Sequence, residues 1–431
     1  MTLARQAAIL TLGNMITRGL GFFLRLMLAR WMGAEAMGIM EMANAAGMLA
    51  LTPVTAGIPS AMSRLTAQRP EDRQPQILRS GLQLIFRLSV LLIPLVVLLT
   101  PFAAWLLGDM RTLPTLLTTV PDVLLLGMGS VYCGYCYGRE NTLLPAAAEC
   151  IEQGVRFVLS VGLLLLLRRS SAGITAALPG VAEAAAALAV VIFFRRLLPC
   201  SGIAPSHNVQ RELWKLAQPT MLSRLCLTGM RALESVLLPV CLRRSGLSAA
   251  AAVSQFGLMN GMAMPLMLIP GVATSALCMI TTPAITRSEG SPQALRCTMR
   301  RMFFPAVLIG LCAAGCLLVG ADVICTHLYR APAMAPLVRF MSPMTLLFAV
   351  HQVQMGVIAG LGLQRQSLTG TVLSSLITLA GTSWLAPLPQ LRLFGSAMAT
   401  MAGHLFAVVW DAAVLRRARR TETKLALPVR M

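Results

Sequence analysis

Apolar blocks of about 20 residues recur along the whole chain, and they constrain its fold more than any other feature. A helix of this length crosses the roughly 30 Å hydrocarbon core of a bilayer, where only helices and closed barrels satisfy every backbone hydrogen bond. Of the 431 residues, 56% are hydrophobic and 12% are charged, which is about half the charged share of a soluble protein. The sequence therefore predicts an all-α, polytopic membrane protein and argues against a large soluble helical enzyme.

The apolar blocks predict about twelve membrane-spanning helices. Several blocks are longer than a single crossing requires, and such helices would tilt, kink or extend past the bilayer. The division between the fifth and sixth spans rests on the short connection RRSSAG. The expected spans cover residues 7–29, 37–62, 82–107, 114–137, 142–167, 174–194, 213–241, 248–281, 302–320, 334–361, 367–388 and 393–414.

Basic residues set the expected topology. The chain has 36 Lys and Arg against 16 Asp and Glu, which gives a formal net charge of +20. With the N-terminus in the cytoplasm, the inner segments hold well over twice as many Lys and Arg as the outer segments, as the positive-inside rule requires. An even number of spans then places both termini in the cytoplasm. Because topology accounts for the charge, and no basic patch alternates with aromatic residues, we expect no nucleic-acid partner.

The 11 cysteines indicate neither a metal site nor a disulfide framework. Cys133 and Cys136 form a C-x-x-C pair, but the pair lies in an apolar block and no second pair or histidine cluster has a matching spacing for zinc. We therefore expect small buried side chains and no metal. The first apolar block is too long for a cleavable signal peptide, so we expect it to be retained as the first span.

The two halves of the chain share a pattern. The first span contains TRGLGFFLR and the seventh contains SRLCLTGMR, both of the form [S/T]-R-x6-R, and the second and eighth spans each carry two prolines before a cytoplasmic arginine. A parallel repeat of two six-helix lobes, related by a pseudo-twofold axis along the membrane normal, is therefore expected. The predicted domains are an N-lobe at 1–200, a cytoplasmic linker at 201–212, and a C-lobe with a basic tail at 213–431.

Charged residues inside the spans are the candidate site. Arg18 and Arg25 are seven residues apart, so they share one helix face about 10.5 Å apart, and Arg224 and Arg231 repeat this spacing. A charge at mid-bilayer costs at least about 2.5 kcal/mol, so these groups should face protein or water. If the two helices face each other, their four guanidiniums make a binding site for an anion, and guanidinium suits phosphate because it forms bidentate hydrogen bonds.

Two of these arginines, and the other charged or polar residues inside the spans, have a plainer explanation than substrate binding or ion coupling. Arg25 would reach the outer interface by snorkelling, and Arg231 would pair with Glu234, which alternatively carries a coupling proton or sodium ion. Glu149, Glu152 and Arg156 on the fifth span indicate an internal ion pair more than a coupling site, whereas Glu183, alone in the alanine-rich sixth span, favours neither role. For His351 and His404 a satisfied hydrogen bond is favoured over proton transfer.

Four prolines lie inside the second and eighth spans. Proline leaves a backbone carbonyl unpaired and kinks a helix, so these residues are candidate hinges of a gate. Prolines are also common in transmembrane helices without such a role. The candidates are Pro53, Pro59, Pro265 and Pro270.

The segments ITRGLGFFLRLMLARWMGAEAMG, GIPSAMSRLTA and LSRLCLTGMRALESVLLPVCLRRSGLS resemble the stage V sporulation protein B-like polysaccharide-export flippases, most strongly at 14–68 and 216–289. This resemblance implies the multidrug/oligosaccharidyl-lipid/polysaccharide (MOP) superfamily, with two six-helix lobes around a central cavity and alternating access. The lipid II flippases of the superfamily carry two further C-terminal helices, which form a lipid groove, and an arginine in the second span. This chain has neither, so a groove of that kind is not expected.

The favoured hypothesis is a flippase, not an enzyme, for an undecaprenyl-diphosphate-linked saccharide in the bacterial cytoplasmic membrane. An Na⁺ or H⁺ gradient or the membrane potential would drive it, with no other cofactor. We expect a monomer surrounded by membrane lipids, with cell-wall synthesis proteins as further candidate partners. The alternatives are a cation-coupled multidrug exporter of the same fold, a membrane glycosyltransferase, for which no catalytic carboxylate or nucleotide-sugar domain is evident, and a scaffold in a sporulation or division complex.

Overall fold

Gly33 divides the first helix into two arms. The computed structural model has a helix, α1, over Leu3–Thr55, but Gly33 has φ 76° and ψ 174°, which no helix contains and which glycine adopts most readily. The arm before Gly33 contains the predicted first span, and the arm after it contains the start of the second span. A second break at Gly57, with φ 83°, separates α1 from α2 (Ile58–Gln68).

The structure describes residues 3–167, 170–198, 204–271, 273–274, 281, 285 and 292–425. These residues form helices and turns, with no strand among them, which confirms the all-α prediction. The chain divides into two units, Met1–Val236 and Leu237–Met431, and each is described by itself. The predicted linker at 201–212 falls partly outside the described residues, and the boundary between the units lies within a helix downstream of it.

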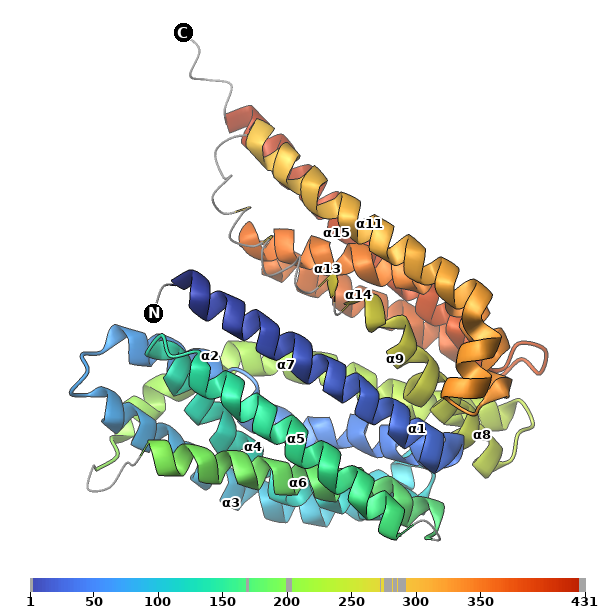
Figure 1. Cartoon of the computed structure of the whole chain (residues 1–431), viewed down its shortest axis with the longest axis horizontal. Coiled ribbons are helices and arrows are strands. Elements are labelled where there is room, and N and C mark those ends of the chain that lie inside the picture. The colour runs from blue at the N-terminus through green and yellow to red at the C-terminus, as the bar shows by residue number, and fades with distance from the viewer. Residues whose placement is uncertain are drawn as a thin grey trace. The chain divides into compact units, whose positions relative to one another are not determined.

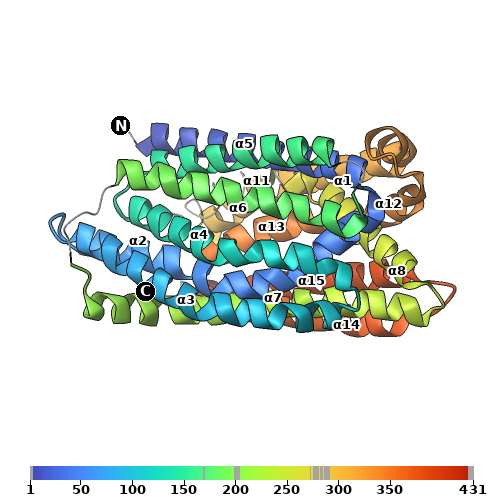
Figure 2. The ribbon, with the colours of Figure 1, turned by 90° about the horizontal axis from the view of Figure 1, so that it is seen from below.

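The first unit is a bundle of long helices. α5 and α6 lie side by side, with the first arm of α1 alongside α5 (Figures 1 and 2). Its core contains Tyr132 and Phe194, whose rings stack with centroids 5.2 Å apart. After α2, the helices are α3 (Gln74–Leu107), α4 (Leu113–Gly138), α5 (Leu143–Leu166), α6 (Ala172–Leu197) and α7 (His207–Arg244), the last of which extends into the second unit.

Hydrogen bonds and salt bridges join the helices at both ends of this bundle. At the end near Gly33, Arg111 donates hydrogen bonds to Asp109 and to Glu35, and these bonds raise the pKa of Arg111, so it stays charged. At the opposite end, Arg69 beyond α2 pairs with Glu212 of α7 at 3.1 Å. A carbon added as Cβ at Gly57 would lie 2.5 Å from the carbonyl oxygen of Ala217, so α7 packs directly against the break.

The second unit contains shorter and more irregular helices. A π-helical turn over Gly257–Ala263 interrupts the eighth predicted span, and α12 meets α13 at an angle of 53° within the tenth. Another π-helical turn, Ile324–Leu328, follows α11. The helices are α8 (Ala249–Phe256), α9 (Met264–Met267), α11 (Pro292–Val323), α12 (Ala335–Met341), α13 (Met344–Gly360), α14 (Gln364–Leu385) and α15 (Leu393–Leu425).

Nine helices of the described residues are long and apolar enough to cross a membrane, or ten if the bent pair α12 and α13 is one span. The difference from twelve has two physical sources. Among the nine, the two arms of α1 and the helix α2 are taken together as one segment, although the chain folds back at Gly33. α5 is not among the nine, because it carries the charges of Glu149, Glu152 and Arg156. The chain is thus a multi-pass helical membrane protein, while the number twelve and the twofold repeat remain predictions.

Candidate functional site

The four predicted arginines all belong to the first unit. Arg18 is exposed on the first arm of α1, and Arg224 and Arg231 are exposed on α7. Arg25 is only partly exposed, because it forms a salt bridge with Glu41 on the second arm of α1. The bend at Gly33 makes this pair, since it folds the second arm back beside the first.

Carboxylates accompany the arginines more closely than the sequence pattern suggests. Glu149 of α5 interacts electrostatically with Arg18, and half-buried Glu234 interacts with Arg231. The expected ion pair of Arg231 with Glu234 remains a prediction, because only this electrostatic interaction supports it. The sequence predicts that the chain reverses between the spans 7–29 and 37–62, but it does not show that Arg25 and Glu41 pair across this reversal.

Exposed guanidiniums inside a membrane span require water. Arg18 lies about 16 Å before the predicted outer end of its span, and Arg224 about 16 Å after the predicted inner end of its own, which puts both near the bilayer centre. Lipid does not solvate such a charge, so intramembrane arginines face a bundle interior or a water-filled cavity. With the predicted span bounds, the exposed side of Arg18 and Arg224 is expected to face water.

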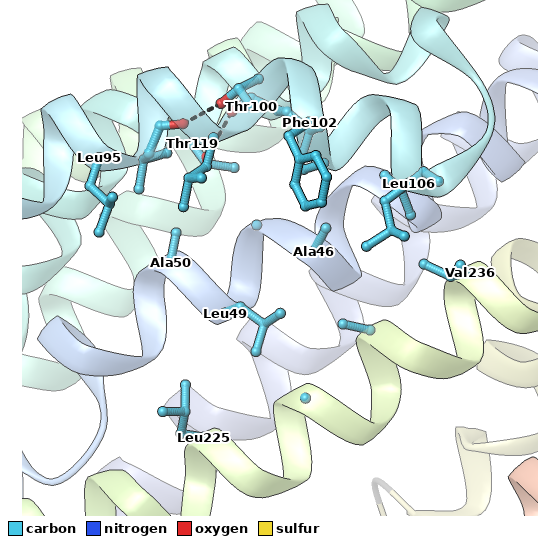
Figure 3. Close-up of a pocket in the computed structure, with 18 of the residues that line it drawn as sticks. Ala46, Leu49, Ala50, Leu95, Thr100, Phe102, Leu106, Thr119, Leu225 and Val236 are labelled. Atoms are coloured by element: carbon cyan, nitrogen blue, oxygen red, sulfur yellow. Dashed lines mark hydrogen bonds between the residues drawn. The ribbon is translucent and has the colours of Figure 1, made fainter.

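A separate apolar cavity of about 770 Å³ lies between the second arm of α1, α3, α4 and α7 (Figure 3). Leu49, Leu95 and Leu225 line it from three different helices. Its two threonines keep their hydroxyls occupied within their own helices: Thr100 donates to the carbonyl of Val96 at 2.6 Å, and Thr119 donates to that of Leu116 at 2.7 Å. The cavity thus offers no free side-chain donor from these threonines and suits a hydrocarbon ligand.

α7 presents the cavity and the guanidiniums on different faces. Successive helix residues project about 100° apart, so Arg224 points away from Leu225, and Arg231 points away from Gly229 and Leu233. One helix of the first unit therefore separates an apolar surface from a cationic one.

The four candidate hinge prolines lie at or near helix interruptions. Pro53 is in the last turn of α1 and Pro59 in the first turn of α2, on either side of the break at Gly57. Pro265 begins α9 directly after the π-helical turn, and Pro270 follows a turn at Leu268. Their role as gates remains a prediction.

Among the described residues, no group of three or more His, Cys, Asp or Glu side chains has the geometry of a metal site. In α4, Cys133 is partly exposed and Cys136 is buried, and neither forms a disulfide.

Comparisons with known proteins place the chain in a family. Residues 3–289, more than half of the chain, match the family model described as polysaccharide biosynthesis protein. The chain belongs to the polysaccharide biosynthesis protein family. It is 28% identical to stage V sporulation protein B of Bacillus subtilis strain 168 over an alignment of 438 residues. This alignment covers 96% of this chain and 84% of the sporulation protein.

Solved structures show the same fold. An inward-facing multidrug resistance MATE family transporter of the MOP superfamily superposes with a TM-score of 0.78 at 15% identity, over 97% of this chain and 99% of that chain. A MOP superfamily transporter from Pyrococcus furiosus, described as having a binding pocket of reversed polarity, superposes with a TM-score of 0.64 at 15% identity, over 97% and 96% of the two chains. The family member thus has the fold of MOP superfamily transporters.

Proposed function

We propose that this protein is a flippase that moves an undecaprenyl-diphosphate-linked saccharide, a cell-wall precursor or a polysaccharide repeat unit, across the bacterial cytoplasmic membrane by alternating access. The family model and the sporulation relative support a transporter of the MOP superfamily acting in polysaccharide biosynthesis. Transport of this kind breaks no bond in the substrate, so the protein is not an enzyme. Both termini lie in the cytoplasm and the working unit is a monomer, which acts beside the proteins of cell-wall synthesis.

The observation that carries the substrate class is the exposure of Arg18 and Arg224, and the predicted span bounds put both residues near the bilayer centre. Guanidinium groups that face water inside the bilayer attract a polyvalent anion, and a diphosphate can accept bidentate hydrogen bonds from more than one of them. Arg25 contributes less than its spacing suggests, because Glu41 already compensates its charge.

The rest of the first unit fits an amphiphilic substrate. A diphosphate saccharide needs a wet cationic surface, and its polyprenyl tail needs an apolar one. α7 carries both on different faces, and the cavity of about 770 Å³ is large enough for part of a hydrocarbon chain. The tail would then stay in contact with lipid or with this cavity while the headgroup crosses through water.

The test is transbilayer movement of a fluorescent undecaprenyl-diphosphate disaccharide in proteoliposomes. We expect wild type to move the lipid and both Arg18→Ala and Arg224→Ala to slow it by about 10-fold or more, since a charge-assisted hydrogen bond contributes about 1.5–3 kcal/mol. Arg79→Ala, which changes an exposed arginine of α3 near its predicted cytoplasmic end, is the control and should transport normally. Equal rates in wild type and both variants would exclude the cationic surface from transport.

The second candidate is a cation-coupled multidrug exporter, which the MATE-family neighbour favours by fold. Such an exporter of organic cations would present carboxylates rather than guanidiniums to its substrate. Here the exposed intramembrane charges on α1 and α7 are arginines. Efflux of ethidium from the same proteoliposomes, without movement of the lipid-linked sugar, would establish this alternative instead.

A further inference from the structure

Three carboxylates and one guanidinium meet in the middle of the first unit, away from the exposed arginines. Arg156 of α5 contacts Glu183 of α6 at 3.0 Å and Glu152 at 3.6 Å. Asp122 of α4 interacts electrostatically with all three of these residues. A single positive charge thus faces three groups that can each be negative.

Asp122 is the least satisfied carboxylate of this cluster. Only 3% of the residue is exposed, and its Oδ1 atom is buried without a hydrogen-bond partner. Arg156 makes its two salt bridges with Glu152 and Glu183, not with Asp122. A carboxylate that is buried and lacks a direct cationic contact is stabilised by binding a proton, which removes its charge.

The three carboxylates lie about midway along α4, α5 and α6, the depth of the bilayer centre if these helices span the membrane as predicted. Asp122 is about 14 Å along α4 from its start, Glu183 about 17 Å along α6, and Glu152 about 14 Å along α5, where half of the hydrocarbon core is about 15 Å. At that depth a net negative charge is costly, so full ionisation of all three carboxylates is disfavoured.

One face of α5 lies between this cluster and the candidate substrate surface, and Glu149 on that face is charged. Glu149, Gln153 and Phe157 recur every four residues on the side of α5 that faces α1, where Phe157 stacks on Phe23 at 5.9 Å. Glu149 interacts with Arg18 on one side and with Glu152 on the other. Glu149 is therefore shared between the predicted anion-binding arginine and the buried carboxylates.

We propose that Asp122 carries an exchangeable proton, and that an anion bound at Arg18 promotes its uptake through Glu149 and Glu152. The bound anion interacts with the guanidinium of Arg18, which then no longer compensates the charge of Glu149. The carboxylates Glu149, Glu152 and Asp122 together thereby gain an uncompensated negative charge. A proton entering from water and binding to a carboxylate oxygen of Asp122 offsets that charge. Because linkage is reciprocal, the protonated protein binds the anion more tightly.

The other ionisable groups on the helices packed against α4 are already engaged or lie elsewhere. On α1, Arg25 pairs with Glu41, and on α3, Arg87 donates to Gln210 at 2.9 Å. On α2, Arg64 is exposed near the helix end. The titration of Asp122 is therefore governed by Glu152, Arg156 and Glu183.

The proton itself is tested without any substrate. Infrared spectroscopy of the purified full chain in lipid nanodiscs is expected to show the carbonyl band of a buried protonated carboxyl group. Asp122→Asn should remove this band, while the control Asp322→Asn, at an exposed aspartate paired with Arg339, should leave it unchanged. A band that persists in Asp122→Asn would overturn the proposal, as would binding of ²²Na⁺ that depends on Asp122.

The link to Arg18 rests on the proposed function and is tested separately with inorganic pyrophosphate as the probe. In weakly buffered solution, pyrophosphate should cause proton uptake by wild type and by Asp322→Asn, but not by Asp122→Asn or Arg18→Ala. We expect the affinity for pyrophosphate to change by about 5-fold or more across the titration in wild type, and to lose this pH dependence in Asp122→Asn. Unaltered uptake in either of the two site variants would overturn the link.

The two experiments separate the two proposals. An infrared band that depends on Asp122, with no flipping of lipid-linked sugar, would leave the proton site in place and exclude the flippase. Where Asp122→Asn is poorly folded, as shown by gel filtration, Glu152→Gln serves as the second variant. It removes the group between Glu149 and Arg156, and should abolish the pyrophosphate-induced uptake while retaining the infrared band.

Discussion

At the residue scale, the arginines of α1 differ in what surrounds them. Arg25 and Glu41 lie 16 residues apart on opposite sides of the bend at Gly33, and they form a salt bridge that holds the two arms together. Arg18 instead interacts with Glu149 of α5, which also interacts with the partly exposed Glu152, and Arg18 itself is exposed. The same residue type thus has different surroundings at two positions of one helix, with a salt bridge across the bend at Arg25 and a neighbouring carboxylate of α5 at Arg18.

The pair of Arg25 and Glu41 can be measured by a double-mutant cycle. Arg25→Gln and Glu41→Gln should each lower the free energy of unfolding by about 1–3 kcal/mol, between the values for exposed and buried pairs, because each leaves a partly buried charge unpaired. The double variant should lose at least about 0.5 kcal/mol less than the sum of the two. Thermal unfolding in detergent provides the measurement.

The matched control for this cycle is the pair of Arg69 and Glu212, where 40% and 43% of the side chains are exposed. Its coupling should be about 0–1 kcal/mol, because water screens exposed charges. If the Arg25 pair shows no larger coupling than the Arg69 pair, the salt bridge does not hold the arms of α1 together.

At the element scale, the bend of α1 depends on the backbone of Gly33. Its φ of 76° and ψ of 174° lie in a region that only glycine occupies without strain, although a Cβ there would meet no atom within 4 Å. Gly33→Ala should therefore cost about 1–3 kcal/mol of stability from backbone strain alone. Gly19→Ala, in the same helix with helical geometry and equally open space, should be neutral or stabilising by up to about 1 kcal/mol. Equal unfolding temperatures would show that the bend does not require glycine.

The cavity between α1, α3 and α7 makes a second prediction at this scale. The Cβ of an alanine at Gly229 would lie 4.0 Å from Leu49, an ordinary contact, so a larger side chain there would enter the cavity instead of clashing with backbone. Gly229→Leu should slow transport of the undecaprenyl-linked sugar more than that of an analogue with a two-isoprene tail. Gly229→Ala is the control for the loss of glycine. The same slowing for long and short tails would rule out the cavity as a tail site.

At the scale of the whole molecule, the sequence predicted the positions of the helices along the chain better than the contacts between residues on different helices. The expected span 114–137 agrees with α4 at Leu113–Gly138, because one apolar block bounded by polar turns leaves little freedom in a membrane. The reversal near Gly33 and the ion pair of Glu152 with Arg156 were also predicted. The pair of Arg25 with Glu41 and the neighbours of Asp122 on α5 and α6 were not predicted. Each joins residues far apart in the sequence, and a lone aspartate inside an apolar block gives no sign of which helix will supply its neighbours.

The assignment of α5 and of the two arms of α1 as separate spans decides the topology of everything that follows. Omitting α5 from the spans would reverse the side of every later loop and of the C-terminus. With twelve spans, the turn at Gly246 between α7 and α8 faces outward, and the turn at Gly362 between α13 and α14 faces the cytoplasm.

Alkaline phosphatase fused after Gly246 should therefore be active, since the enzyme needs an oxidising compartment for its disulfides. The same enzyme fused after Gly362 should be inactive, and green fluorescent protein at either terminus should fluoresce. The reverse activities at Gly246 and Gly362, with a fluorescent N-terminal fusion, would mean that an even number of crossings precedes α8, instead of the seven expected. In that case α5 lies within the bundle or at its surface without spanning, because its charges would no longer have to cross the membrane.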